Sequence, residues 1–285
     1  AIDLDADGIE TLPIPTNGSL PVLFDHDADG VKTGTGWLKG DDAWLVWDRN
    51  GNGNIDSGRE LFGVDTPLPG ATAAQLAGGG GTYLDGFRAL RGLDANADKV
   101  FNAADAAFTQ VRLWQDLNGD ALSQAGELST LAAKGITAIS LADTRVSTDL
   151  GGGNSITATA PVTRTGGNLH IDAVGLGAGN LNLADNPFYR EFPDQIPWTA
   201  QARTLPEMGG SGWLRDLREA MSLGTPGAAA LAQSVAAFSA TSTRDGQLAR
   251  LDGLLEAWAG TTELYRPPAV AAHSCVARMH THQDQ

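Results

Sequence analysis

Residues 48–60 read DRNGNGNIDSGRE, and this stretch decides how the amino-terminal part of the chain folds. Its oxygen-bearing side chains alternate with other residues: Asp48, Asn50, Asn52, Asn54 and Asp56. This spacing matches an EF-hand-type loop, in which one turn of chain surrounds a Ca²⁺ ion that takes about six to eight oxygen ligands. Gly53 stands at the turn position, and Glu60 lies one residue beyond the usual closing acid. The stretch therefore predicts a calcium-binding loop.

Two further stretches repeat the alternation, each with one ligand that would bind through its backbone carbonyl (Leu122 or Val100). The first set is Asp116, Asn118, Asp120, Leu122, Gln124 and Glu127. The second set is Asp94, Asn96, Asp98, Val100, Asn102 and Asp105. Ala121 and Lys99 replace the turn glycine, at a cost of about 1 kcal/mol. We expect weaker binding at the second set, because a short Asp closes it.

Two stretches nearer the start have the acidic turn but no closing acid. Their carboxylates are Asp3, Asp5, Asp7, Asp25, Asp27 and Asp29. Since the closing acid normally supplies two oxygens, these loops need distant ligands or water, and we expect the loops at Asp48 and Asp116 to bind more tightly. His26 lies inside one of them and is interpreted as an outward-facing filler.

A solvated turn is the competing interpretation of any single stretch of this kind, because Asp, Asn and Gly are common turn residues. Five stretches within about 125 residues change the balance, since so many carboxylates repel one another without cations. We therefore expect several Ca²⁺ ions as cofactors. Mg²⁺ fits less well, because it prefers tight octahedral sites that retain water.

The overall composition narrows the class of protein. The 285 residues contain 34 acidic and 19 basic side chains, a formal net charge of -15, which argues against nucleic acid or an anionic membrane as partner. No run of roughly 18 apolar residues predicts a membrane span. The single cysteine, Cys275, excludes an intramolecular disulfide. Acidic, Gly-rich chains almost without cysteine are typical of proteins that calcium folds outside the cell.

The periodicity predicts an α+β fold in which EF-hand-like calcium loops with short helices and strands precede a β-hairpin and a C-terminal helical segment. The expected helices span residues 87–93, 103–114, 213–222, 226–240 and 243–258. The expected strands span residues 136–141, 155–163 and 169–174. We divide the chain into a calcium-loop region at 1–145, an α/β region at 146–266 packed on it as one module, and a flexible tail at 267–285.

Several motifs, taken in order, resemble the self-processing module of bacterial RTX proteins, best known from iron-regulated proteins of the Frp type. They are IDLDADGIET at 2–11, LFDHDADG at 23–30, TGW at 35–37, DRNGNG at 48–53, ELFG at 60–63, AADAAF at 103–108, WQDLNGD at 114–120, WLRDLREA at 213–220, and the segment 248–258. The resemblance covers nearly the whole chain up to Pro267. Long motifs in this order are specific.

The resemblance implies a secreted, extracellular protein, exported by type I secretion, and a calcium-triggered autocatalytic cut of an Asp–Pro bond at the amino end of the module. The new terminal Asp then forms an isopeptide bond with a lysine. The implied partners are the upstream segment of the module's own precursor and a lysine-bearing acceptor protein. This chain contains no Asp–Pro pair. The scissile Asp is therefore expected upstream of Ala1, with no catalytic residue in the processed form.

Two other functions compete with this one. A structural calcium-binding spacer of a secreted adhesin or toxin would need the same loops, and an Asp–Pro pair before Ala1 is what would distinguish self-processing from it. A hydrolase that uses the carboxylates for acid–base work is the remaining alternative.

The loops generate one prediction about folding. Adding CaCl₂ to protein treated with EDTA should increase ordered secondary structure and raise the melting temperature, because the free energy of binding metal adds to that of folding. Circular dichroism measures both quantities. If neither the spectrum nor the melting temperature changes when calcium is added, the prediction is contradicted.

Overall fold

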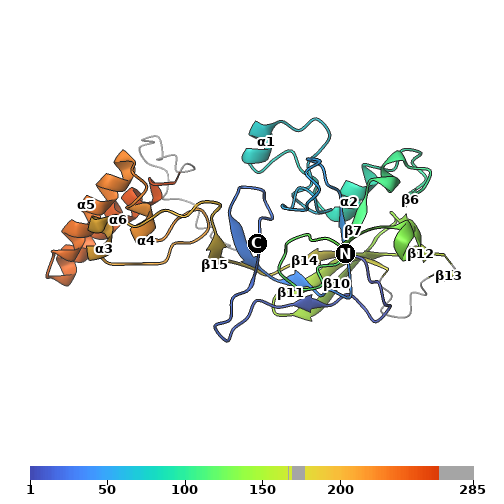
Figure 1. Ribbon diagram of the computed structural model, residues 1–285, viewed down its shortest axis with the longest axis horizontal. Helices are drawn as coiled ribbons and strands as arrows, with labels where there is room; N and C mark the ends of the chain where they lie inside the picture. Colours follow the sequence, from blue (N-terminus) through green and yellow to red (C-terminus); the bar gives the residue numbers. More distant parts are fainter. Residues whose placement is uncertain (166, 169–176, 263–285) are drawn as a thin grey trace, which may run out of the picture. The chain divides into compact units, whose positions relative to one another are not determined.

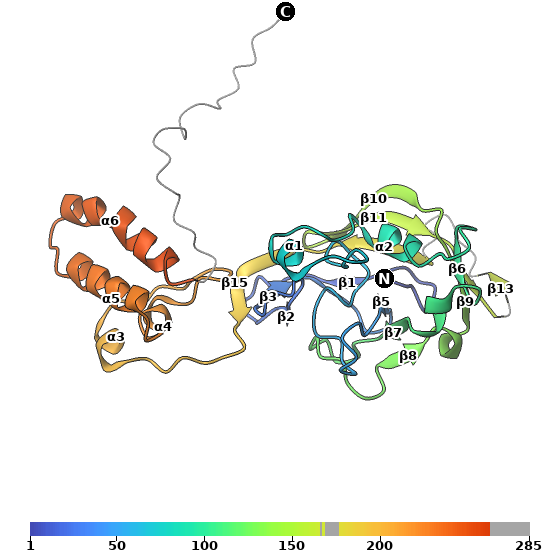
Figure 2. The ribbon, with the colours of Figure 1, turned by 90° about the horizontal axis from the view of Figure 1, so that it is seen from above.

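The computed structural model describes residues 1–165, 167–168 and 177–262 (Figures 1 and 2). The chain divides into two compact units, Ala1–Asp194 and Gln195–Gln285. This division lies at a different place from the one drawn from the distribution of the acidic loops. The strand expected at 169–174 and the tail expected at 267–285 fall outside the described residues.

The predicted fold class is wrong. In the part of the chain that the structure describes, the fold is mostly β-sheet, with five small antiparallel sheets and only about 23% helix, so it is not an EF-hand-like α+β protein. The strands of the sheets, in spatial order, are β1 (Thr11–Leu12) and β4 (Trp37–Leu38); β15 (Asp185–Glu191), β3 (Lys32–Thr35) and β2 (Val22–Phe24); β5 (Trp44–Val46), β7 (Arg112–Trp114) and β8 (Leu128–Thr130); β13 (Gly167–Asn168), β12 (Val162–Arg164), β9 (Ile136–Ser140) and β6 (Val100–Asn102); and β10 (Thr144–Gly151), β11 (Asn154–Ala160) and β14 (Ala178–Asn182).

Residues 103–114 do not form the helix that their apolar pattern predicted. This segment instead forms a short 3₁₀ turn, η1 (Ala106–Thr109), followed by β7. Val111, Leu113 and Trp114 are fully buried, and β7 is the central strand between β5 and β8. A short apolar run is compatible with either a helix or a strand. Here the backbone N–H and C=O groups of β7 form hydrogen bonds with strands on both of its edges, which favours the strand.

Helices contribute little to the amino-terminal unit. α2 (Gly86–Arg91) lies where a helix was expected at 87–93, and Asp85 caps it by accepting a hydrogen bond from Arg88 N. α1 (Ala73–Ala77) begins with a capping box formed by Thr72 and Gln75, and a second 3₁₀ turn is η2 (Ala132–Lys134). The acidic loops therefore lie between strands and turns rather than between helix pairs.

The β10–β11 hairpin has the alternation of a sheet with one buried face. Ile156, Ala158 and Ala160 point inward and are almost fully buried. Residues 151–153 form the turn, and all three glycines have positive φ, a conformation that favours residues without a side chain. β12 and β13 form a second hairpin, at residues where one was expected from Gly166 and Gly167.

Two hydrophobic clusters stabilise the amino-terminal unit. One surrounds Phe101, Leu113 and Ile139, which are fully buried. The other is aromatic: the ring of Trp37 lies 5.1 Å from that of Phe24 and 5.6 Å from that of Trp114, measured between centroids. The indole nitrogens of Trp37 and Trp114 also contact the acidic loops.

The second unit has a helical core. Its helices are α3 (Ala200–Thr204), α4 (Leu217–Ala220), α5 (Pro226–Ser239) and α6 (Arg244–Ala259), and α5 and α6 lie side by side (Figure 2). Leu231, Leu254 and Trp258 are buried between these helices. Pro226 occupies the first turn of α5, and Thr243 caps α6 by accepting a hydrogen bond from Gly246 N.

Candidate metal centres

The five acidic loops share one backbone conformation. In each loop, the fourth and the sixth residues have positive φ. These pairs are Ala6 and Gly8, Ala28 and Gly30, Gly51 and Gly53, Ala97 and Lys99, and Gly119 and Ala121. The repeated pattern shows that the loops are copies of one turn, including the loops where Lys99 and Ala121 replace glycine.

Backbone strain is concentrated in these loops. Among the described residues, the non-glycine positions with positive φ are Ala6, Ala28, Ala97, Lys99 and Ala121, and each lies in a loop. The left-handed conformation costs roughly 1–2 kcal/mol for a residue with a side chain. Such strain persists only where surrounding interactions impose it, and it is typical of functional sites.

The first acid of each loop holds the turn from inside. Asp116 accepts hydrogen bonds from Gly119 N and Ala121 N, both at 2.8 Å. Asp48 accepts from the equivalent nitrogens of Gly51 and Gly53, at 2.7 and 2.9 Å. The amides of the strained residues thus point at the carboxylate, which leaves the alternate side chains on the same concave side of the loop.

A second carboxylate closes four of the five loops, and it does so in the same way each time. One oxygen accepts from the amide of the second loop residue, and the other from an amide near the end of the loop. Glu60 bonds Arg49 N and Asp56 N at 3.2 and 3.0 Å. Glu127 bonds Leu117 N and Gln124 N at 3.1 and 2.9 Å.

Asp105 closes the loop at Asp94 in the same manner, through Ala95 N at 2.8 Å and Asn102 N at 3.0 Å. Glu60, Asp105 and Glu127 are all buried, unlike the exposed acids and amides at the middle of each loop. The offset of Glu60 by one residue does not prevent it from making both hydrogen bonds. The role of the three acids as metal ligands stays a prediction.

The acid that closes the first loop is Asp42, which the sequence analysis missed. Its two oxygens accept from Leu4 N and Glu10 N, both at 3.1 Å, across 38 and 32 residues of sequence. Asp42 is only 1% exposed. The expectation that this loop needs a distant ligand named no residue, because the spacing within the loop carries no information about Asp42.

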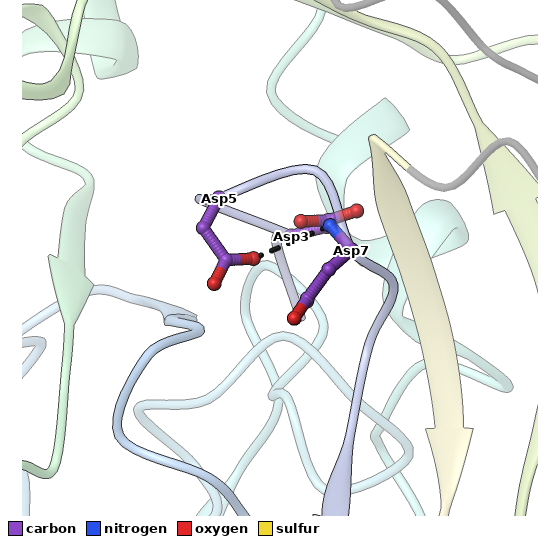
Figure 3. A group of neighbouring side chains, drawn as sticks. All are labelled: Asp3, Asp5 and Asp7. Carbon is purple, nitrogen blue, oxygen red and sulfur yellow. Dashed lines mark hydrogen bonds between the residues drawn. The ribbon is translucent and has the colours of Figure 1, made fainter.

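Acidic groups crowd around this first loop. Asp3, Asp5 and Asp7 bring carboxylate oxygens within 4.8 Å of one another, as do Glu10, Asp41 and Asp42. Figure 3 shows the first trio on one turn, where Asp7 N donates to Asp5 at 3.4 Å. Lys39, whose Nζ lies 3.0 Å from Glu10 Oε1, partly offsets the charge.

Two buried carboxylates of this group ionise less readily than usual. The pKa of Asp42 is raised to about 7, chiefly by burial and also by the charges of Asp3 and Asp41, against hydrogen bonds that lower it. Burial also raises the pKa of Asp3. A divalent cation would reverse this preference, because it stabilises the ionised form of every carboxylate around it.

The loop at Asp25 has different surroundings. Asp25 accepts from Asp29 N and Gly30 N, both at 3.0 Å. Beside the loop lies Asp65, whose pKa burial raises to about 6, with the charge of Asp27 adding to the shift. Asp65 is thus the nearby carboxylate that could add a ligand to this loop.

The prediction for His26 is wrong, because its ring faces the aromatic cluster and not the solvent. Its Nε2 lies 3.1 Å from Thr35 Oγ1, and its ring centroid is 5.0 Å from that of Phe24. Burial lowers the pKa of His26 to about 4, so the ring is neutral at pH 7.

Buried indoles connect the loop at Asp116 to the aromatic cluster. Trp37 Nε1 donates to Asp116 Oδ2 at 2.7 Å, and Trp114 Nε1 donates to Glu127 Oε2 at 3.3 Å. The first and closing acids of this loop therefore share their oxygens between loop amides and the core. These two hydrogen bonds join the loop to the packed tryptophans.

Comparison with known proteins identifies the family of this chain. The chain matches the SPM domain family over residues 1–174. It is an SPM domain protein. It is 42% identical over 261 residues to the iron-regulated protein FrpA of Neisseria meningitidis serogroup C. This alignment covers 92% of the chain and 22% of FrpA, so the chain spans about a fifth of that relative's length.

These matches confirm the resemblance to the self-processing module of Frp-type RTX proteins. The residues matched to the SPM domain lie within the amino-terminal unit and include all five loops. In the described part of this SPM domain protein, no helix is long and apolar enough to cross a membrane.

The double role of Glu127 generates a prediction. Replacing Glu127 by Ala removes the acceptor for two loop amides and a buried indole, which should lower the free energy of unfolding by about 2–3 kcal/mol. Urea denaturation in excess CaCl₂ measures the loss. Glu191→Ala, which removes an exposed partner of Lys32, is the matched control and should change little. Equal losses for the two variants would contradict the assigned role of Glu127.

Proposed function

We propose that this chain is the calcium-dependent self-processing module of a longer, secreted RTX protein, exported by type I secretion. In this proposal, calcium triggers cleavage of an Asp–Pro bond upstream of Ala1, and the freed Asp forms an isopeptide bond with a lysine of an acceptor protein. Membership of the SPM domain family carries the proposal. The acidic loops supply a physical reason for the dependence on calcium.

Three properties support Ca²⁺ as the cofactor. The loops offer only oxygen ligands in the alternating arrangement that suits a hard cation with many ligands. Their closing acids Glu60, Asp105 and Glu127 are buried, and so is Asp42, which is unfavourable for anions without a cation. Five loops also account for much of the formal net charge of -15. The ligands proposed for each ion are those predicted from the sequence, with Asp42 added at the first loop.

The chemistry requires no catalytic side chain from this sequence. A carboxylate oxygen of the upstream Asp attacks that residue's own main-chain carbonyl carbon, and the bond to the proline nitrogen breaks. The proline leaves as a secondary amine after taking up a proton, and a cyclic anhydride remains. Water then opens the anhydride to two carboxyl groups, or a lysine amine opens it to an amide and one carboxyl group. Such an intramolecular attack has a high effective concentration.

The first loop explains how calcium could control this reaction. The loop begins at Asp3, two residues from Ala1, and Asp42 binds its backbone through Leu4 and Glu10. An ion held by Asp3, Asp5 and Asp7 would order the chain next to the scissile bond. Without the ion, repulsion among the same carboxylates opposes that order.

The alternative is a structural calcium-binding spacer of a secreted adhesin or toxin. An Asp–Pro pair directly upstream of Ala1 in the full gene would favour self-processing, and its absence there would favour the spacer. The strained loops and buried acids would serve a spacer equally well, so only the reaction distinguishes the two functions.

The reaction is tested with a fusion that carries the native upstream segment with its Asp–Pro bond. Adding CaCl₂ should cleave the purified fusion without any protease, yielding a fragment that ends in Asp and some product of higher mass joined through lysine. Gel electrophoresis and mass spectrometry measure both products. Changing the scissile Asp→Asn removes the attacking carboxylate and should abolish cleavage. A folded fusion that stays intact in calcium would leave the spacer as the function.

The role of Asp42 is tested in the same fusion. Asp42→Asn removes one charge and one acceptor from the first loop, so half-maximal cleavage should need roughly ten times more calcium, a change of about 1.4 kcal/mol in binding. The matched control is Asp185→Asn, a change at an exposed position of β15. If both variants cleave at the wild-type calcium concentration, Asp42 does not contribute to the metal centre.

A further inference from the structure

The first three residues are extended and form β-bridges on both sides, from Ile2 to Ala178 and to Ala43. Ala1 N donates to Gly179 O at 2.8 Å, and Gly179 N donates back to Ala1 O at 3.0 Å. Ile2 exchanges two hydrogen bonds with Ala43 in the same way, at 2.7 and 3.0 Å. Asp3 N donates to Gly177 O. The segment therefore runs antiparallel to β14 along its free edge, because β11 occupies the other edge.

An apolar pocket lies at the start of this segment, and we call it the N-terminal pocket. Besides Ala1 and Ile2, its lining includes Leu45, Phe62, Phe87 and Leu90, with Asn180 at one side. Its free space is about 30 Å³, room for about two water-sized groups. That is too small for a folded partner and suits the aliphatic side chain of a single residue.

The register determines which residue would face this pocket. Ala1 is opposite Gly179, so a residue directly before Ala1 would be opposite Asn180, and its side chain would be on the same side as that of Ile2. Ile2 is 1% exposed and packs in the cluster that contains Leu45, Phe87 and Leu90. The alternation of side chains thus directs the preceding residue into the N-terminal pocket.

We propose that, in a longer chain, the residue directly before Ala1 extends the segment beside β14 and fills the N-terminal pocket with an apolar side chain. This path of the chain does not depend on any cleavage. Resting on the proposed function, we also infer that the pocket, by anchoring this residue, positions the scissile bond that lies upstream of it. The hydrogen-bonding atoms of Leu181 on the same edge of β14 then face the chain beyond it.

The path of the chain is tested without any cleavage. A fusion with its native upstream segment, in which the scissile Asp→Asn change prevents cutting, is studied by NMR in CaCl₂. Contacts between the side chain before Ala1 and the rings of Phe62 and Phe87 should appear, and the Gly179 amide should be protected from hydrogen exchange. A preceding side chain that shows no contact with the pocket would overturn the proposal.

The positioning role is tested in the cleavable fusion. Phe62→Ala enlarges the partly buried rim of the pocket, and it should slow cleavage about tenfold at saturating calcium without changing the calcium needed for half-maximal rate. Phe188→Ala is the matched control, because Phe188 is 70% exposed in the same unit, and its rate should equal that of wild type. Circular dichroism verifies that both variants fold.

The two proposals fail in different ways. NMR contacts in a folded fusion whose cleavable form stays intact would retain the path of the chain and reject self-processing. Cleavage at the wild-type rate in folded Phe62→Ala, together with missing contacts, would retain self-processing and reject the pocket. Contacts combined with an unchanged rate in Phe62→Ala would overturn the positioning role alone.

Discussion

The amino-terminal unit depends on one repeated interaction, a buried carboxylate that accepts hydrogen bonds from two amides of the same loop. In four of the five loops, the closing acid holds both ends of a turn that contains two left-handed residues. Hydrogen bonds to an ionised acceptor contribute about 1.5–3 kcal/mol each, enough to offset roughly 1–2 kcal/mol of strain per residue. The hydrogen bonds stabilise the loops, and the concentrated negative charge destabilises them.

The opposition between these hydrogen bonds and charge repulsion connects the stability of the loops to the proposed function. Because the closing acids are buried, their charge is poorly screened, and any cation bound inside the loops would relieve a cost that the backbone hydrogen bonds alone do not remove. Hydrogen bonds from Trp37 and Trp114 connect the loop at Asp116 to the aromatic core. The hydrogen bond from Leu4 N to Asp42 connects the first loop to the segment that begins at Ala1. Metal binding in the proposed function would therefore act on both the core and the segment beside the scissile bond.

The loops occur here without the helix pairs of an EF-hand. β5 precedes the loop at Asp48, and β7 and β8 flank the loop at Asp116. An ion-binding turn of this kind requires only its own alternation of ligands and two left-handed residues, so either strands or helices can lead into it. The inference from loop to fold class failed for this reason.

The sequence by itself determined what depends on neighbours along the chain. The turn geometry, the closing roles of Glu60, Asp105 and Glu127, helix α2 and the caps of α5 and α6 all follow from groups a few residues apart. Only the tertiary structure decided the rest: β7 in place of a helix, Asp42 as the acid of the first loop, and the N-terminal pocket. Each of these depends on pairing or packing between distant segments, and the free energy of such contacts is absent from any local pattern.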